Sequence, residues 1–166
     1  MTPKLYYDQV VFESQTYLVA STDDGLAFVG SPNAGLEELQ RFYPTADLVL
    51  DQHKNRTVMC QLKHYLEGNG DLSAVKLDIT GTPFQEAVWD ALRGIPFGSV
   101  VTYQDIADKL GRPRAAQAVG NAVGKNPVLI VVPCHRVVSK SKQGSGYRGG
   151  MLMKEWLIAH EQNVAK

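Results

Sequence analysis

The chain has no long apolar run, few cysteines and no excess of charge of one sign. Its longest aliphatic stretch, "VLIVV" at residues 128–132, is far shorter than the roughly 18 residues that a membrane-spanning helix needs. The segment "MTPKLYYDQVVFE" lacks a basic region followed by an apolar one, so we expect neither a signal peptide nor a membrane partner. Cys60 and Cys134 are the only cysteines. Without signs of export, we expect both to be free thiols in a reducing cytoplasm.

Charge balances over the whole chain but not along it. The 17 Lys and Arg residues equal the 17 Asp and Glu residues in number. Residues 1–79 hold 6 basic and 11 acidic residues, a balance of −5, whereas residues 80–166 hold 11 and 6, a balance of +5. This asymmetry favours a polyanion as the partner of the second half. Unevenly scattered surface charge would also produce it. We predict two domains, 1–79 and 80–166.

The first half carries the pattern of a small α/β domain. Strands are expected at 16–20 and 26–30, and further strands in "KLYYDQVVFE", "ADLVLD" and "AVKLDITGTP". "GLEELQRFY" and "NRTVMCQLKHYLEGNG" indicate helices. Cys60 falls inside the apolar pattern of the second helix, which predicts a core position. With His53 and His64 it lacks a compact metal-ligand spacing, so no metal site is expected.

The second half is predicted to be mostly helical. Thr82-Pro83 is a typical helix start, because proline is favoured at the first helical position. Thr102 is predicted to begin another helix, with Asp105 three positions later in the place of a capping-box acid.

A pair of short helices follows around one glycine. Gly111 is expected to end the first, and Pro113 to open the second, "RPRAAQAVGNAVGKN". The pattern fits a helix-turn-helix, and equally a plain pair of packed helices. Because the second helix consists of small residues, its backbone could lie close to another surface. Arg112, Arg114 and Lys125 are placed around it to meet phosphates.

The stretch "VVPCHRVVSK" places Cys134, His135 and Arg136 at the end of an apolar segment, itself predicted to be a buried strand or core segment. Cys134 is therefore either a buried structural thiol or a nucleophile. A free thiol has a pKa of about 8.5, so a nucleophile needs a base or a positive field, which its neighbours and a helical turn here would supply. His135 would reach the sulfur through a water or a tight turn, oriented by Glu161 or by His160.

The loop "GSGYRG", residues 144–149, matches G-x-G-x-x-G letter for letter. A dinucleotide site needs a strand running directly into such a loop, whereas "SKSKQ" precedes it here. We interpret the loop instead as a flexible flap that holds Tyr147 over a flat ligand.

Several spaced motifs together resemble a known family. "PCHRVV", preceded by "GKNP" and followed by "YRGG" and "KEWLIAHE", is similar to the O6-alkylguanine-DNA alkyltransferases, or methylated-DNA–protein-cysteine methyltransferases. The resemblance runs from about Phe84 to Glu161, and no motif extends it to the first half. It implies a small ribonuclease H-like α/β domain at 1–79 and a mostly helical domain with a helix-turn-helix at 80–166.

The resemblance also implies an activity. Such a protein binds double-stranded DNA through the minor groove, flips a damaged guanine out of the stack and transfers its O6-alkyl group to Cys134. The transfer is expected to be irreversible and stoichiometric and to need no cofactor. The protein is expected to be a monomer. O4-alkylthymine remains open as a second substrate. The lack of cysteines near the amino terminus argues against the zinc site of some members.

The same resemblance assigns the chemical roles. His135 is expected to take the thiol proton through a water, and Glu161 to orient His135. Asn126 is expected to support the active-site turn. Tyr103 would hydrogen-bond N3 of guanine and help the leaving base to accept charge.

The resemblance also assigns binding roles. The edge of the guanine is expected to be bound by backbone groups of Cys134, Val137 and Arg148. The ring of Tyr147 is expected to pack on the face of the guanine. DNA contacts are expected from a set of polar and basic side chains: Arg112, Arg114, Gln117, Lys125 and Arg136.

Two residues depart from the family pattern. Gln117 stands where the family usually has an arginine that inserts into the stack as the guanine leaves, so Arg114 could take part in its place. Arg148 stands where a small residue is common. Its side chain could narrow the pocket or reach a phosphate.

Three other functions compete with alkyl transfer. A non-catalytic protein that binds alkylated guanine typically has tryptophan in place of Cys134. A helix-turn-helix regulator would explain the charge asymmetry but leaves "PCHRVV" and the glycine-rich loop without a purpose. A cysteine hydrolase needs a substrate-cleft motif that the sequence lacks. We therefore predict DNA repair by alkyl transfer.

Overall fold

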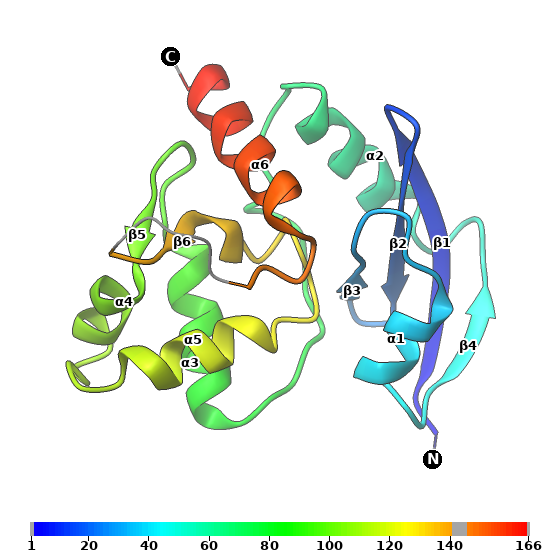
Figure 1. Ribbon diagram of the computed structural model, residues 1–166. Coiled ribbons are helices and arrows are strands. Elements are labelled where there is room, and N and C mark those ends of the chain that lie inside the picture. The colour runs from blue at the N-terminus through cyan, green and yellow to red at the C-terminus, as the bar shows by residue number, and fades with distance from the viewer. Residues whose placement is uncertain (1, 141–145, 166) are drawn as a thin grey trace. The chain divides into compact units, whose positions relative to one another are not determined.

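The computed structural model describes residues 2–140 and 146–165 (Figure 1). The chain divides by its contacts into two units, Met1–Ile79 and Thr80–Lys166. None of the helices within the described residues combines the length and the apolarity needed to cross a bilayer. Over the same residues, His, Cys, Asp and Glu side chains nowhere gather in threes that could hold a metal ion.

The first unit is built on a four-stranded mixed sheet of order β3-β2-β1-β4. An antiparallel meander comprises β1 (Lys4–Phe12), β2 (Gln15–Ser21) and β3 (Leu26–Val29). The remaining strand, β4 (Asp47–Leu50), pairs with β1 in parallel. Two helices complete the unit, α1 (Leu36–Phe42) and α2 (Arg56–Leu66). Its core joins both sheet and helix through Leu5, Leu18, Phe28 and Leu39.

Two predictions for the first unit were wrong. The segment "AVKLDITGTP" forms no strand. Its only β-type pairing within the described residues is an isolated bridge between Leu77 and Leu26. Cys60 is exposed rather than in the core. The buried face of α2 includes Val58 and Leu62, and Cys60 lies about 200° around the helix from Val58 at 3.6 residues per turn. Its thiol lies 3.9 Å from Nε2 of His64, one turn away.

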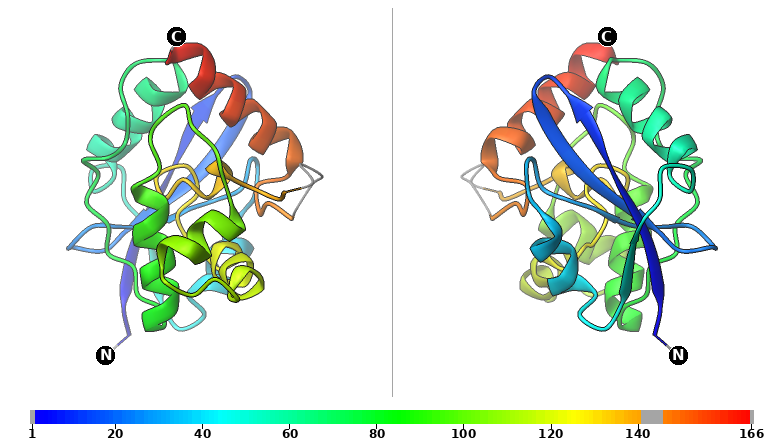
Figure 2. Two further views of the ribbon diagram at one scale, coloured as in Figure 1. Left: turned by 90° about the vertical axis from the view of Figure 1, so that its left-hand side faces the viewer. Right: turned by 90° about the vertical axis from the view of Figure 1, so that its right-hand side faces the viewer.

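The second unit is mostly helical. Its helices are α3 (Pro83–Arg93), α4 (Tyr103–Lys109), α5 (Ala116–Gly124) and α6 (Met151–Val164), with a 3-10 turn η1 (Cys134–Arg136). Two short strands, β5 (Val101–Thr102) and β6 (Val137–Val138), pair in parallel. α3, α4 and α5 contact one another, and α6 contacts η1 (Figure 2). Trp89 of α3 donates its Nε1–H to the carbonyl of Ala122 in α5 at 2.9 Å.

Both predicted helix starts are confirmed by capping boxes. Thr82 Oγ1 accepts from the backbone N–H of Gln85 at 3.1 Å, and Oε1 of Gln85 accepts from the N–H of Thr82 at 3.0 Å. Thr102 and Asp105 exchange the equivalent bonds at 3.1 and 2.8 Å. Each box satisfies two N–H groups that a helix start would otherwise leave without partners.

The turn between α4 and α5 is longer than predicted. Gly111 follows the end of α4 with a φ of 73°, the left-handed conformation typical of a helix terminus. Pro113, however, does not open the next helix, since α5 begins at Ala116. The carbonyl of Pro113 instead accepts from Nε2 of Gln104 on α4 at 2.7 Å, which ties the turn back to the preceding helix.

The segment "VLIVV" is buried as predicted, but it is a turn and not a strand. The N–H of Val132 donates to the carbonyl of Val128 at 3.2 Å, which closes the turn. Ile130 adopts a φ of 71°, a conformation that costs a β-branched residue about 1–3 kcal/mol. An apolar run long enough for a strand thus bends back on itself and delivers the next residues to the interior.

Candidate active site

Cys134 begins η1 directly after this buried turn and is only 4% exposed. Nδ2 of Asn126 donates to Sγ of Cys134 at 3.3 Å and to the carbonyls of Val128 and Val132 at 3.1 Å each. Its Oδ1 accepts from the N–H of Val128 at 2.9 Å. A single buried amide therefore satisfies the polar backbone of the turn and holds the thiol in place.

His135 and Glu161 form a buried pair behind the turn. Nε2 of His135 lies 2.8 Å from Oε2 of Glu161 on α6, and the residues are 0% and 1% exposed. With Nε2 donating to the carboxylate, Nδ1 is the nitrogen left to exchange a proton, and it has no hydrogen-bond partner within the described residues. His160, the alternative orienting group, instead stacks on Trp156 with 4.6 Å between the ring centroids.

Arg136 lies in the interior, so the predicted DNA contact of its side chain was wrong. It is 9% exposed, and its Nε and Nη2 donate to the two oxygens of Glu161 at 2.8 and 2.9 Å. Nη1 donates to the carbonyl of Ile95 at 2.8 Å. All three nitrogens are used within the fold, and the two-pronged pairing is the strong form of an arginine–carboxylate contact. Arg136 thus fixes the carboxylate that fixes His135.

Burial sets the protonation states of the two reactive groups. Burial raises the pKa of the Cys134 thiol. The hydrogen bond from Asn126 and the charges of Arg148 and Lys154 lower this pKa by less than burial raises it. Burial also lowers the pKa of His135, against Glu161, which raises it. At neutral pH the resting site therefore holds a thiol and a neutral imidazole. A neutral imidazole has one unprotonated nitrogen, and that nitrogen is what removal of the thiol proton requires.

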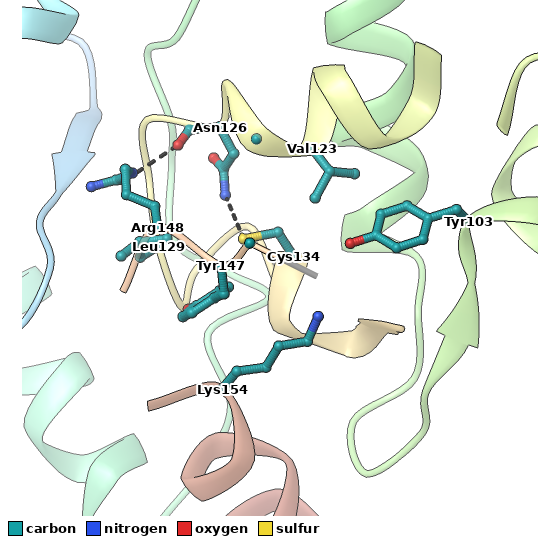
Figure 3. Close-up of a pocket in the computed structure, with 10 residues that line it drawn as sticks. Tyr103, Val123, Asn126, Leu129, Cys134, Tyr147, Arg148 and Lys154 are labelled. Carbon is teal, nitrogen blue, oxygen red and sulfur yellow. Dashed lines mark hydrogen bonds between the residues drawn. The ribbon is translucent and has the colours of Figure 1, made fainter. Parts of the chain in front are cut away.

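A small pocket lies at the thiol, with about 290 Å³ of empty space when the adjoining solvent is included (Figure 3). Tyr103, Tyr147 and Arg148 line it, as do Cys134 and Asn126. Figure 3 shows the Tyr103 ring on one side and Tyr147 and Arg148 on the other. The remaining lining residues are Val123, Gly124, Leu129, Gly146 and Lys154.

Lys154 is a pocket residue that the sequence analysis missed. It is 4% exposed, and its Nζ donates to the carbonyl of Val137 at 2.7 Å. Val137, predicted to read the guanine edge, is buried and is not among the lining residues. Lys154, Leu157 and Glu161 share the buried face of α6 at i, i+3 and i+7. In the sequence, Lys154 and Glu161 fall at the spacing of the apolar face of this helix, and this pattern could have indicated that both side chains are buried.

The predicted flap lies partly outside the described residues, which omit 144 and 145. Gly146 and Tyr147 line the pocket. Gly149 has no room for a side chain, because a Cβ there would lie 2.8 Å from Cε2 of Tyr147. This close approach places the tyrosine ring directly against the backbone of the loop.

The predicted DNA-contacting residues around α5 are exposed: Arg112, Arg114, Gln117 and Lys125. The guanidinium of Arg112 lies 5.5 Å from the ring centroid of Phe84. The last turn of α5 contributes Val123 and Gly124 to the pocket. The helix that carries Gln117 therefore also forms one wall of the thiol site.

Comparisons with known proteins agree with a site built on one reactive cysteine. Residues 83–163 match the family described as "6-O-methylguanine DNA methyltransferase, DNA binding domain". The inducible methylated-DNA–protein-cysteine methyltransferase of Bacillus subtilis is 42% identical over 98% of this chain and 93% of its own length. The methylated-DNA–protein-cysteine methyltransferase of Methanosarcina barkeri is 36% identical over 96% of this chain and 98% of its own length.

A solved structure extends the likeness to the fold. The O6-methylguanine methyltransferase of Mycobacterium tuberculosis, crystallised in complex with DNA, has a TM-score of 0.84 and 34% identity. The match covers 96% of this chain and 94% of that one. The chain belongs to the methylated-DNA–protein-cysteine methyltransferase family.

Asn126 offers a test of how the thiol is tuned. In Asn126→Ala the thiol loses its donor, so its pKa should rise further and alkylation by iodoacetamide at neutral pH should slow about tenfold, the effect of one pKa unit. The pH–rate profile should shift to higher pH, because less thiolate forms at each pH. Asn163→Ala, an exposed change on α6, is the control. A slower rate with an unshifted profile would mean that Asn126 acts only on the turn.

Proposed function

We propose that the protein repairs DNA by transferring the alkyl group of O6-alkylguanine irreversibly to Cys134. The observation that carries this is the position of a buried thiol in a small pocket, hydrogen-bonded to Asn126 and followed in the chain by the buried His135–Glu161 pair. Membership of the methyltransferase family supports the same reaction. A protein that only bound alkylated bases would have no use for a thiol followed in the chain by a buried histidine that is paired with a carboxylate.

The proposed reaction is an in-line displacement at carbon. His135 takes the thiol proton at Nδ1 through a water, and the imidazolium that results is stabilised by the Glu161 carboxylate. Sγ of Cys134 bonds to the alkyl carbon while the C–O6 bond breaks, and its electron pair goes to the guanine. Tyr103 donates a hydrogen bond to N3 and passes its proton to the departing guanine, and the proton held by His135 then returns through solvent to the Tyr103 oxygen, so that the step is balanced overall. The thioether is stable to hydrolysis, so each molecule acts once.

Recognition of DNA is assigned to the second unit. We propose that α4 and α5 act as a helix-turn-helix whose small-residue second helix enters the minor groove of duplex DNA. Arg112, Arg114 and Lys125 would meet phosphates. Gln117 would fill the place of the flipped guanine, which would enter the pocket against Tyr147. Gln117 lies on the same helix as Val123, and this shared helix would couple extrusion of the base to its entry.

The rest of the proposal concerns the whole molecule. The first unit would be the ribonuclease H-like domain of the family, and the protein would act as a cytoplasmic monomer. Both cysteines are free in the structure, in keeping with a reducing compartment. Neither a cofactor nor a metal enters the proposed step, because the thiol, the base and the donor are all supplied by the chain.

The test is to count product against protein. With a duplex that carries O6-methylguanine in excess, we expect one restored guanine per protein molecule and no more. Intact-mass spectrometry should show a single methyl adduct, located on the peptide that contains Cys134. Continued product formation beyond one equivalent would refute the single-turnover mechanism. An unmodified protein after incubation would refute the reaction itself.

A further inference from the structure

The exposed face of α5 carries two amide side chains. The exposed residues of this helix are Gln117, Ala118, Asn121 and Gly124. The buried residues Val119 and Val123 each lie about 160° around the helix from Asn121 at 3.6 residues per turn. Asn121 therefore lies in the middle of the exposed face, and Gln117 lies one turn before it. Neither amide hydrogen-bonds to another described residue, so both are presented to whatever the helix meets.

Asn121 differs from its neighbours on this face. The exposed residues beside it, Ala118 and Gly124, have no polar group in their side chains, and their small size lets another surface approach the backbone. Gly124 also lines the pocket at the thiol. It lies about 4.5 Å along the helix axis from Asn121, and base pairs in a duplex are stacked about 3.4 Å apart. A guanine placed in the pocket would therefore bring a base pair within about two steps of it to Asn121.

The amide of Asn121 matches one kind of base pair in the minor groove. An A·T pair presents only acceptors there, whereas a G·C pair adds the N2 amino group of guanine as a donor. An asparagine amide has both an acceptor and donors. Its Oδ1 can accept from N2 of guanine while Nδ2 donates to N3 of the same base. Asparagine is one of the side chains that minor-groove proteins use to read this pattern.

We propose that Asn121 is a specificity-determining residue that reads a G·C pair next to the lesion through the guanine amino group in the minor groove. This inference rests on the proposed function, in which α5 enters the minor groove and the flipped guanine enters the pocket. Gln117 is assigned there to the gap left by the flipped base, so Asn121 meets a pair that stays stacked. Reading of this pair sets which sequence contexts are repaired fastest and leaves the transfer step unchanged.

The test is a competition between two duplexes that both carry O6-methylguanine. In one of them a neighbouring G·C pair is replaced by inosine·C, which still pairs but lacks the N2 amino group. Each of the two base pairs on either side of the lesion is replaced in turn, and limiting protein receives equal amounts of both duplexes. The ratio of restored guanines measures the preference for G·C. At one position we expect this ratio to be about tenfold higher for wild type than for Asn121→Ala, within the range for a pair of hydrogen bonds to one base.

Two comparisons make the ratio interpretable. Inosine also loosens the duplex, but this effect is common to every variant and cancels when their ratios are compared. Asn163→Ala makes the same substitution at an exposed position of α6, and it should keep the wild-type ratio. Asn121→Ala should fold, because the position is exposed and alanine is the better helix former.

The outcomes separate this inference from the proposed function. Equal ratios in wild type and Asn121→Ala at every position overturn the inference. If Asn121→Ala slows repair of both duplexes equally, the side chain contacts only the sugar-phosphate backbone, and the inference also falls. An equal change of ratio in Asn163→Ala overturns it as well. A wild-type protein that restores no guanine in any duplex would refute the proposed alkyl transfer itself.

Discussion

Cys134→Ser should abolish alkyl transfer completely while leaving DNA binding and folding in place. Serine keeps a hydrogen-bond acceptor for Nδ2 of Asn126, so the turn that holds residue 134 retains its partner. A hydroxyl at this site has no usable anionic form near neutral pH, and it is a far weaker nucleophile than a thiol. The side chain is nearly isosteric, so the main cost is that of burying a hydroxyl in place of a thiol, and the free energy of unfolding should fall by about 1–3 kcal/mol.

The other cysteine supplies the control. Cys60 is an exposed thiol on α2, 3.9 Å from His64, and it is the only other thiol in the chain. Cys60→Ser should therefore transfer one methyl group per molecule at the wild-type rate. The two variants are compared by intact mass after incubation with O6-methylguanine duplex, and by fluorescence anisotropy for DNA binding. An adduct that persists in Cys134→Ser, or one that disappears in Cys60→Ser, would show that Cys134 is not the alkyl acceptor.

The residues of the site could be predicted from the sequence more fully than the geometry that surrounds them. Short linear motifs carry Cys134, His135 and Glu161, and the structure brings the latter two within hydrogen-bond distance across 26 positions. Asn126 could be assigned to the turn by resemblance alone. An apolar run does not show that the amide of Asn126 supplies the backbone hydrogen-bond partners that a sheet would otherwise provide. This is why "VLIVV" was compatible with a strand.

The residues that were placed wrongly share a cause. Arg136 was expected at DNA together with the other basic residues of the second half, and sequence spacing does not show that a carboxylate 25 positions later faces it. Lys154 was missed for the same reason, since its partner is a backbone carbonyl rather than a motif residue. Cys60 shows the opposite error, because one thiol among apolar residues says little about which face of α2 it occupies. For Arg136 and Lys154, a tertiary partner decides the position.

The second large effect is expected from Glu161→Gln. The change removes one negative charge that pairs with both Arg136 and His135, in a residue that is 1% exposed. Loss of one partner from a buried ion pair leaves an uncompensated charge, so the free energy of unfolding should fall by about 3–5 kcal/mol. Glu161 also raises the pKa of His135, and without it that pKa falls further below its ordinary value. The weaker base should slow transfer about 100-fold.

The loss of stability can be measured in the second unit alone. The only two tryptophans, Trp89 and Trp156, belong to the second unit, so their fluorescence during urea unfolding reports on the unit that contains Glu161. Glu155→Gln is the control, because it makes the same substitution at an exposed position of the same helix and should stay within about 0.5 kcal/mol of wild type. An equal loss in both variants would mean that the helix, and not the buried pair, is responsible.

A double variant separates the two roles of the carboxylate. Arg136→Met with Glu161→Leu removes both buried charges and replaces them with apolar side chains of similar size, so stability should recover most of what either single change loses. Transfer should not recover, because His135 still lacks the acceptor that fixes its tautomer and supports its positive charge. Stability that returns without activity would identify Arg136 as a positioning residue and Glu161 as the partner that His135 needs. Activity that returned with stability would show that the pair serves only the fold, because a His135 that works without a carboxylate needs no orienting group.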